Sequence, residues 1–136
     1  MIRVKATREG LVGKQTACGW TIDTVTPFVA LPSERALHRQ VRVSNPAAGK
    51  SIVATVLDVG PWNTHDDAYV FQPATNGVNP AIPSDFEGVT ETRPASERGI
   101  SLSGDGTNGA GIDLGQAVWS ALEMRDNGLV DWEFLP

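Results

Sequence analysis

The feature that most constrains the fold is a pair of extended runs separated by a short turn. The segment HRQVRVSN (38–45) alternates apolar and polar residues through Val41 and Val43, which is the period of a half-buried strand. NPAAGK (45–50) combines Asn-Pro with Gly, as turns do, and SIVATVLD (51–58) follows as a β-branched run. The pattern predicts a β-hairpin over residues 39–58.

Two further segments alternate in the same way, at the two ends of the chain. Residues 2–6 and the segment LVDWEFL (129–135) both have the period of a strand. With 136 residues the chain fits one domain, and its order of elements has no βαβ rhythm and no solenoid repeat. The sequence therefore predicts a single mostly-β barrel domain over residues 1–136.

One short helix is predicted after Asp113. The apolar residues of 114–122 recur at i, i+3, i+4, i+7 and i+8, which places them on one stripe of a helix. Asp113 stands at the expected N-cap with Gln116 three residues later, and Asn127-Gly128 can end the helix.

A long loop is predicted over residues 73–111, because four prolines and seven glycines leave no room for a regular element of any length. Loops of this size inside a domain are uncommon and often functional. Two interpretations stay open, a lid over a binding site and a surface decoration.

Charge and hydropathy exclude several classes of partner. The net charge is −5 and the 11 Lys and Arg residues are scattered, which disfavours binding to nucleic acid. No window is apolar enough for a membrane span, so no membrane partner is expected, and residues 1–14 do not resemble a signal peptide. A neutral or amino-bearing partner is compatible with this charge, whereas the compartment and the oligomeric state stay open.

Two aspartates occupy comparable positions at the ends of apolar segments. Asp58 precedes Val-Gly-Pro-Trp, and Asp113 lies where AGI meets the predicted helix. Cleavage of a glycosidic bond needs a carboxyl group that protonates the leaving oxygen, and often a second one. Each aspartate also has a structural interpretation, Asp58 as a turn former and Asp113 as a helix cap whose dipole would lower its pKa.

The segments VRVSNPAAGKSIVATVLDVGPW (41–62) and GIDLGQAVWSAL (111–122) resemble the double-psi β-barrel of rare lipoprotein A, and FVALPS (28–33) is similar to the stretch that precedes its hairpin. Expansins, barwin-like proteins, family 45 endoglucanases and one class of lytic transglycosylases share this barrel. The resemblance implies a six-stranded double-psi β-barrel. It also implies that the protein is located in the cell envelope or is secreted. It also implies a polysaccharide partner, peptidoglycan above all.

The resemblance also implies roles for individual residues. Asp113 matches the essential acid of the family, Asp58 matches the second aspartate of the same groove, and Trp62 matches an aromatic residue that can stack on a sugar or pack in the core. Expansins carry a histidine where this chain has Gly111. The cleaving relatives have a Glu and a His before the hairpin, where this chain offers Asp23.

The segment WNTHDD (62–67) adds further candidates. His65 is a possible substitute for the family's histidine, or else part of a solvated loop, and Asn63 is a candidate binding residue beside Trp62. A metal site is not expected, because the only other histidine is His38 on a predicted strand. No cofactor is expected either, since the chain has no phosphate-binding loop and no C-x-x-C pair.

Three functions remain compatible with these residues. The first is acid catalysis on a cell-wall glycan, by Asp113 with Asp58 and with Asp23 or His65 as a third member. The second is a non-catalytic module that binds a polysaccharide through Trp62 and Trp20. The third is a barrel that contacts other proteins, because a fold alone does not define a function.

Overall fold

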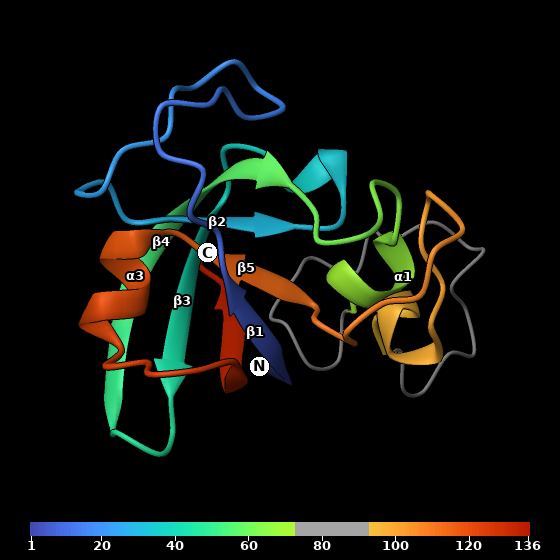
Figure 1. Ribbon diagram of the computed structural model, residues 1–136. Coiled ribbons are helices and arrows are strands. Elements are labelled where there is room, and N and C mark those ends of the chain that lie inside the picture. Colours follow the sequence, from blue (N-terminus) through green and yellow to red (C-terminus); the bar gives the residue numbers. More distant parts are fainter. Residues whose placement is uncertain (73–92) are drawn as a thin grey trace.

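Six strands close into a β-barrel in the computed structural model, which describes residues 1–72 and 93–136 (Figure 1). In chain order the strands are β1 (Ile2–Arg8), β2 (Phe28–Leu31), β3 (Gln40–Asn45), β4 (Lys50–Val59), β5 (Ile112–Leu114) and β6 (Gly128–Phe134). Around the barrel the order is β1-β5-β2-β4-β3-β6. The pairs β1–β5 and β2–β4 are parallel and the other four pairs are antiparallel. The expected class, a mostly-β six-stranded double-psi barrel, is confirmed.

The predicted hairpin is present and forms the longest ladder of the barrel. Strands β3 and β4 pair antiparallel from Gln40 opposite Thr55 to Asn45 opposite Lys50. Asn45 is buried at the turn, where its Nδ2 donates a hydrogen bond to the carbonyl of Leu122 at 2.8 Å. The terminal strands predicted over 2–6 and 129–135 are β1 and β6, which pair with each other.

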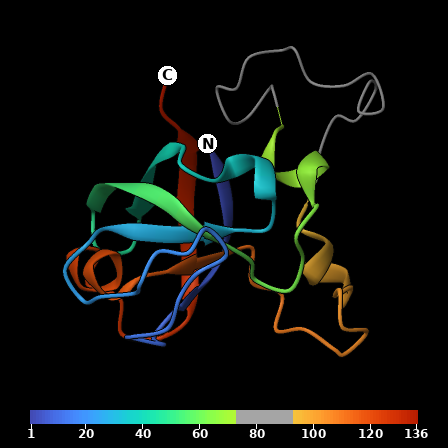
Figure 2. The ribbon, with the colours of Figure 1, turned by 90° about the horizontal axis from the view of Figure 1, so that it is seen from above.

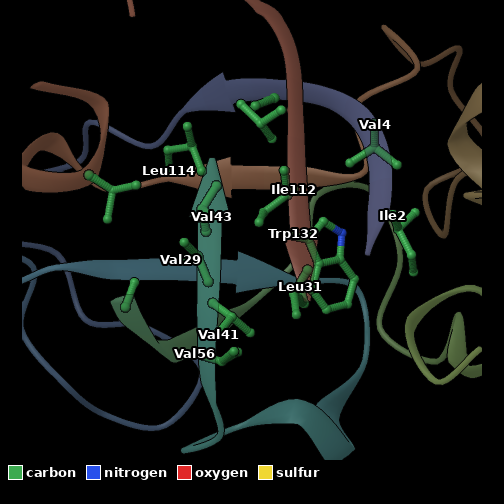
Figure 3. Packing of buried hydrophobic residues seen from close by; sticks show 14 of the residues in the cluster. Ile2, Val4, Val29, Leu31, Val41, Val43, Val56, Ile112, Leu114 and Trp132 are labelled. Carbon is green, nitrogen blue, oxygen red and sulfur yellow. The ribbon is translucent and has the colours of Figure 1, made fainter. Parts of the chain in front are cut away.

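The core fills the barrel with β-branched and aromatic side chains. Figure 3 shows Val and Ile side chains from facing strands pointing inward around the indole of Trp132. The indole is fully buried, and its Nε1 donates a hydrogen bond to the Tyr69 hydroxyl at 2.8 Å, so its one polar atom is satisfied. Burial of each such side chain contributes roughly 1.5–3 kcal/mol, which explains why alternation in the sequence predicts the strands well.

Helix α3 (Gln116–Ala121) follows β5, but it begins later than the sequence predicts. Gly115 is the N-cap and makes no side-chain cap, whereas Asp113 belongs to β5 and is held extended between β1 and β2. Gly115 is required here, because a Cβ atom would lie 2.3 Å from Cε1 of Phe28. The capping role expected for Asp113 is therefore wrong. The helix also ends early, with Leu122 as its C-cap rather than at Asn127-Gly128.

The short helices α1 (Asp67–Val70) and η3 (Ala95–Arg98) gather beside one end of the barrel (Figures 1 and 2). A third, η1 (Glu34–Ala36), follows β2. Of the loop predicted over 73–111, residues 93–111 return to the barrel, where the amide of Gly111 bonds to the carbonyl of Lys5. Residues 73–92, on which the lid interpretation depends, lie outside the described residues.

Within 1–72 and 93–136, no helix has the length and apolar character needed to cross a membrane.

Candidate active-site cleft

The backbone places Asp58 and Asp113 in one row across the barrel. Strand β2 lies between β5 and β4, and its Ala30 is the register partner of Asp113 on one side and of Asp58 on the other. Two strand spacings put the two aspartate Cα atoms about 9–10 Å apart. The side chain of Ala30, between the two aspartates, is small and buried.

An irregularity in the β2–β4 ladder brings Asp58 to this row. Val29 pairs with Val56, but the next residue, Ala30, pairs with Asp58, so β4 contains one extra residue at Leu57. Val56 points into the core, and without this bulge Asp58 would point inward as well, because side chains alternate. The bulge therefore turns the Asp58 side chain to the outer face of the barrel.

Asp113 occupies a half-buried position beside β1. Thr7 is its register partner, and the Thr7 hydroxyl donates a hydrogen bond to Oδ1 of Asp113. Burial raises the pKa of Asp113 to about 6, the Thr7 hydrogen bond opposes this rise, and the negative charge of Asp58 adds to it. A carboxyl group with a pKa near 6 holds a proton at mildly acidic pH, as a general acid must.

Asp58 has a different environment, in which backbone amides bind it. Its Oδ1 accepts hydrogen bonds from the amides of Ala17, at 2.9 Å, and Val59, at 2.8 Å. These donors stabilise the ionised form of a carboxyl group, and the Ala17 contact ties the 9–27 segment to the end of β4. Asp58 is both a structural anchor and a source of negative charge near Asp113.

Glu9 is a third carboxyl group at this site, and it was not predicted from the sequence. It follows β1, and its amide extends the ladder by a hydrogen bond to the carbonyl of Leu114 at 2.8 Å. Burial is the main cause that raises the pKa of Glu9 to about 9, and a hydrogen bond to Asp58 and the charges of Asp58 and Asp113 add to the rise. The available signal was its place two residues after Thr7, on the same side of a strand that ends there.

These groups border an open cleft of about 480 Å³. Asp113, Thr7 and Glu9 line one part of it, and Leu11 and Trp62 supply apolar surface. Asp58 is not among the described residues that line the cleft. The indole of Trp62 is 37% exposed, and its Nε1 donates a hydrogen bond to Oδ1 of Asn108 at 2.9 Å, which fixes the ring at the rim.

The hollow surface continues beyond Trp62. Trp62 also borders a second hollow, which shares Asn63, Thr64 and Leu102 with a third one. Trp62 and Leu102 are exposed apolar side chains at the borders between these hollows. Three adjoining hollows form a surface suited to an extended ligand rather than to a single small molecule.

The structure places the other two candidate catalytic residues away from this cleft. His65 is exposed and lines the third hollow with Asp66, and its backbone forms an isolated bridge with Ser33. Asp23 accepts hydrogen bonds from the amides of Val25 and Thr26 and from the Thr26 hydroxyl. These bonds lower the pKa of Asp23 and make it a turn former.

The two remaining candidate binding residues also have local partners. Trp20 packs edge-on against Phe28, with ring centroids 4.8 Å apart. Asn63 donates from Nδ2 to the carbonyl of Ile100 at 3.0 Å and borders the second and third hollows. Of the three residues expected to bind substrate, only Trp62 lies at the cleft that contains Asp113.

Gly111, the position that corresponds to the expansin histidine, has no space for a side chain in this barrel. Gly111 is buried, and a Cβ atom there would lie 2.7 Å from Cγ of Pro94 and 2.9 Å from the Tyr69 hydroxyl. No histidine can occupy this position without displacing both neighbours. In the described parts of the chain, no group of three His, Cys, Asp or Glu side chains has the geometry of a metal site.

Comparison with known proteins shows the family but not its function. The model of a family described as a domain of unknown function (DUF8814) matches residues 1–133, so the chain belongs to this family. No curated protein matches. Among solved structures, Streptomyces papain inhibitor (SPI) is similar, with a TM-score of 0.49 and 17% identity over 99% of this chain and 94% of that chain.

Proposed function

We propose that this member of the DUF8814 family cleaves a cell-wall glycan of the peptidoglycan type, with Asp113 as the general acid. The observation that carries the proposal is the environment of Asp113, which is half-buried at the wall of an open cleft with a pKa of about 6. Its proton is available to a leaving glycosidic oxygen at mildly acidic pH.

In the proposed reaction the Asp113 carboxyl group acts first as an acid and then as a base. Asp113 gives its proton to the leaving oxygen as the bond between that oxygen and the anomeric carbon breaks. The Asp113 carboxylate then takes a proton from the attacking hydroxyl group, which belongs to water or to the sugar itself. Asp58, in the same row as Asp113 across the barrel, contributes negative charge, which favours the positive charge that develops on the sugar ring.

The ligand is proposed to be a neutral, extended chain. The adjoining hollows on either side of Trp62 accommodate successive units of a polymer, and the exposed indole offers a flat surface to the apolar face of a sugar. The net charge of −5 and the carboxyl groups at the cleft disfavour a polyanion. The resemblance to barrels that act on cell walls points to the same class of ligand.

Asp113→Asn tests the proposal in an assay for soluble fragments released from insoluble peptidoglycan. Loss of an acid catalyst lowers the rate by about 10²–10⁴-fold. Asp126→Asn is the matched control, because Asp126 is exposed and its Oδ1 accepts a hydrogen bond from the adjacent amide of Asn127. Release that is equal in wild type and Asp113→Asn would contradict the catalytic role.

The second candidate function is glycan binding without cleavage. The closed position at Gly111 favours it, because the histidine that expansins place there has no space in this barrel. Sedimentation with insoluble peptidoglycan separates the two functions. A pure binding module sediments, releases nothing, and loses affinity about tenfold in Trp62→Ala but not in Trp62→Phe, which keeps an aromatic surface.

A further inference from the structure

The backbone of Glu9 directs its side chain to the same outer face as Asp113. Glu9 follows Thr7 by two residues, and strand geometry places both side chains on one side. The hydrogen bond from the Glu9 amide to the Leu114 carbonyl holds this position next to β5, at the residue after Asp113. Glu9 and Asp113 accordingly line the same cleft.

The Glu9 carboxyl group lies close enough to that of Asp58 for a hydrogen bond, which is one of the causes that raise the pKa of Glu9. Two ionised carboxylates have only acceptors, so this contact requires a proton on one of them. Asp58 accepts two backbone amide hydrogen bonds at Oδ1, which favour its ionised form. Oε2 of Glu9, in contrast, is fully buried and takes no hydrogen bond from a described donor, which favours a neutral carboxyl group.

We propose that Glu9 is a positioning residue that keeps its proton and donates it in a hydrogen bond to Asp58, so that the pair presents a single negative charge to Asp113. This inference rests on the proposed function for the role of Asp113 as acid. Glu9 gives Asp58 a third donor beside the amides of Ala17 and Val59. A second negative charge at this wall would hold Asp113 protonated well above the pH range in which it is a useful acid.

The charges that face Glu9 come from two elements. Asp58 on β4 and Asp113 on β5 both act on its pKa, and each raises it. Arg8, the neighbour of Glu9 along the chain, also lines the cleft, but its guanidinium lies over the ring of Trp119, 5.7 Å from the centroid.

The test is a titration of side-chain carboxyl groups by ¹³C NMR on the full chain, without any substrate. In the wild type, the Glu9 signal is expected to stay in its protonated form from pH 4 to 7.5, while Asp113 titrates near pH 6. A Glu9 signal that titrates at the ordinary pH of a glutamate would overturn the proposal. This arm uses the unaltered protein, so it does not depend on whether a variant folds.

Two substitutions separate the donor from the bulk of the side chain. Glu9→Gln keeps a donor for Asp58 and adds no charge, so the titration curve of Asp113 is expected to stay where the wild type has it. Glu9→Leu keeps a similar size but removes the donor, which leaves more of the Asp58 charge acting on Asp113, so the Asp113 midpoint is expected to rise. A Glu9→Leu protein with the wild-type Asp113 curve would overturn the proposal. Glu34→Gln, at an exposed position of η1, is the matched control.

The outcomes also separate this inference from the proposed function. If the wild type releases no glycan but Glu9 stays protonated, the proposed function is wrong, whereas the hydrogen bond from protonated Glu9 to Asp58 is supported. If release follows the protonation of Asp113 while Glu9 titrates as an ordinary glutamate, the function stands and the role of Glu9 fails.

Discussion

Asp58 and Asp113 flank Ala30 in a single row across three strands of the barrel. The two aspartates are 55 positions apart in the chain, and a bulge in β4 is needed to bring Asp58 to the outer face. Their environments then differentiate them. Asp113 lines the cleft and bonds to a hydroxyl group, whereas Asp58 is not among the described residues that line it and bonds to backbone amides.

The hydrogen bond from the Thr7 hydroxyl lowers the pKa of Asp113. Thr7→Val removes the donor that lowers the pKa of Asp113. The pH midpoint of the Asp113 carboxyl titration is therefore expected to move upward by about one pH unit. A shift of this size corresponds to the free energy of one hydrogen bond to a charged group. Thr7→Ser keeps the hydroxyl and is expected to keep the wild-type midpoint. A midpoint that is the same in Thr7→Val and Thr7→Ser would contradict this account.

The charge of Asp58 acts on Asp113 in the opposite direction. Asp58→Asn retains Oδ1 as an acceptor for the amides of Ala17 and Val59 but removes the charge that raises the pKa of Asp113. The Asp113 midpoint is expected to fall by roughly 0.5–1 pH unit, since such a pair of charges interacts by roughly 1 kcal/mol. An unchanged or higher midpoint, measured beside the Asp126→Asn control, would argue against this coupling.

Glu9 makes stability depend on pH. Its pKa is raised to about 9 in the folded chain, so the stability that it contributes is full below the ordinary pKa of a glutamate and is lost as the pH rises from about 4.5 to 9. Glu9→Gln does not titrate and escapes this loss. Because the side chain is partly exposed and screened, we expect the free energy of unfolding of Glu9→Gln to exceed that of the wild type by about 1–3 kcal/mol at pH 8.5.

Urea unfolding of both proteins at pH 4.5, 6.5 and 8.5 measures this difference. The advantage of Glu9→Gln is expected to grow at each step, and Glu34→Gln is expected to show none. A constant difference over the three pH values would mean that Glu9 ionises normally in the folded protein.

The closed position at Gly111 is a matter of packing. In Gly111→Ala the new methyl group would meet Pro94 and the Tyr69 hydroxyl at distances below 3 Å, and the cost of overpacking is about 1–3 kcal/mol. Gly106→Ala is the matched control, because a Cβ atom at Gly106 has no neighbour within 4 Å. Thermal unfolding of the two variants measures the difference, and equal melting temperatures would show that the site relaxes freely.

The sequence predicted those elements whose residues bury one face. The hairpin of β3 and β4 and the terminal strands β1 and β6 carry a clear alternation, because each has one side in the core. The start of α3 was predicted wrongly, since ladder pairing with β1 and β2 outweighs the capping tendency of Asp113. Local propensity cannot represent such a tertiary contact.

The site was predictable only in part, for a similar reason. Asp113 and Asp58 were singled out by their positions at the ends of apolar runs, but the register that makes both neighbours of Ala30 depends on the bulge at Leu57. Beyond its place two residues after Thr7, Glu9 had no local signal of burial, since Gly10 and Leu11 after it are exposed. Its surroundings come from β4 and β5, which are distant in the chain.

The pH dependence of glycan release tests the central claim most directly. If protonated Asp113 is the acid, release by the wild type falls above about pH 6, by about tenfold for each further pH unit, and release by Asp113→Asn is about 10²–10⁴-fold slower than that of the wild type at acidic pH. The same midpoint is expected in the Asp113 carboxyl titration. Release that stays level from pH 5 to 8, or that persists in Asp113→Asn, would contradict the account.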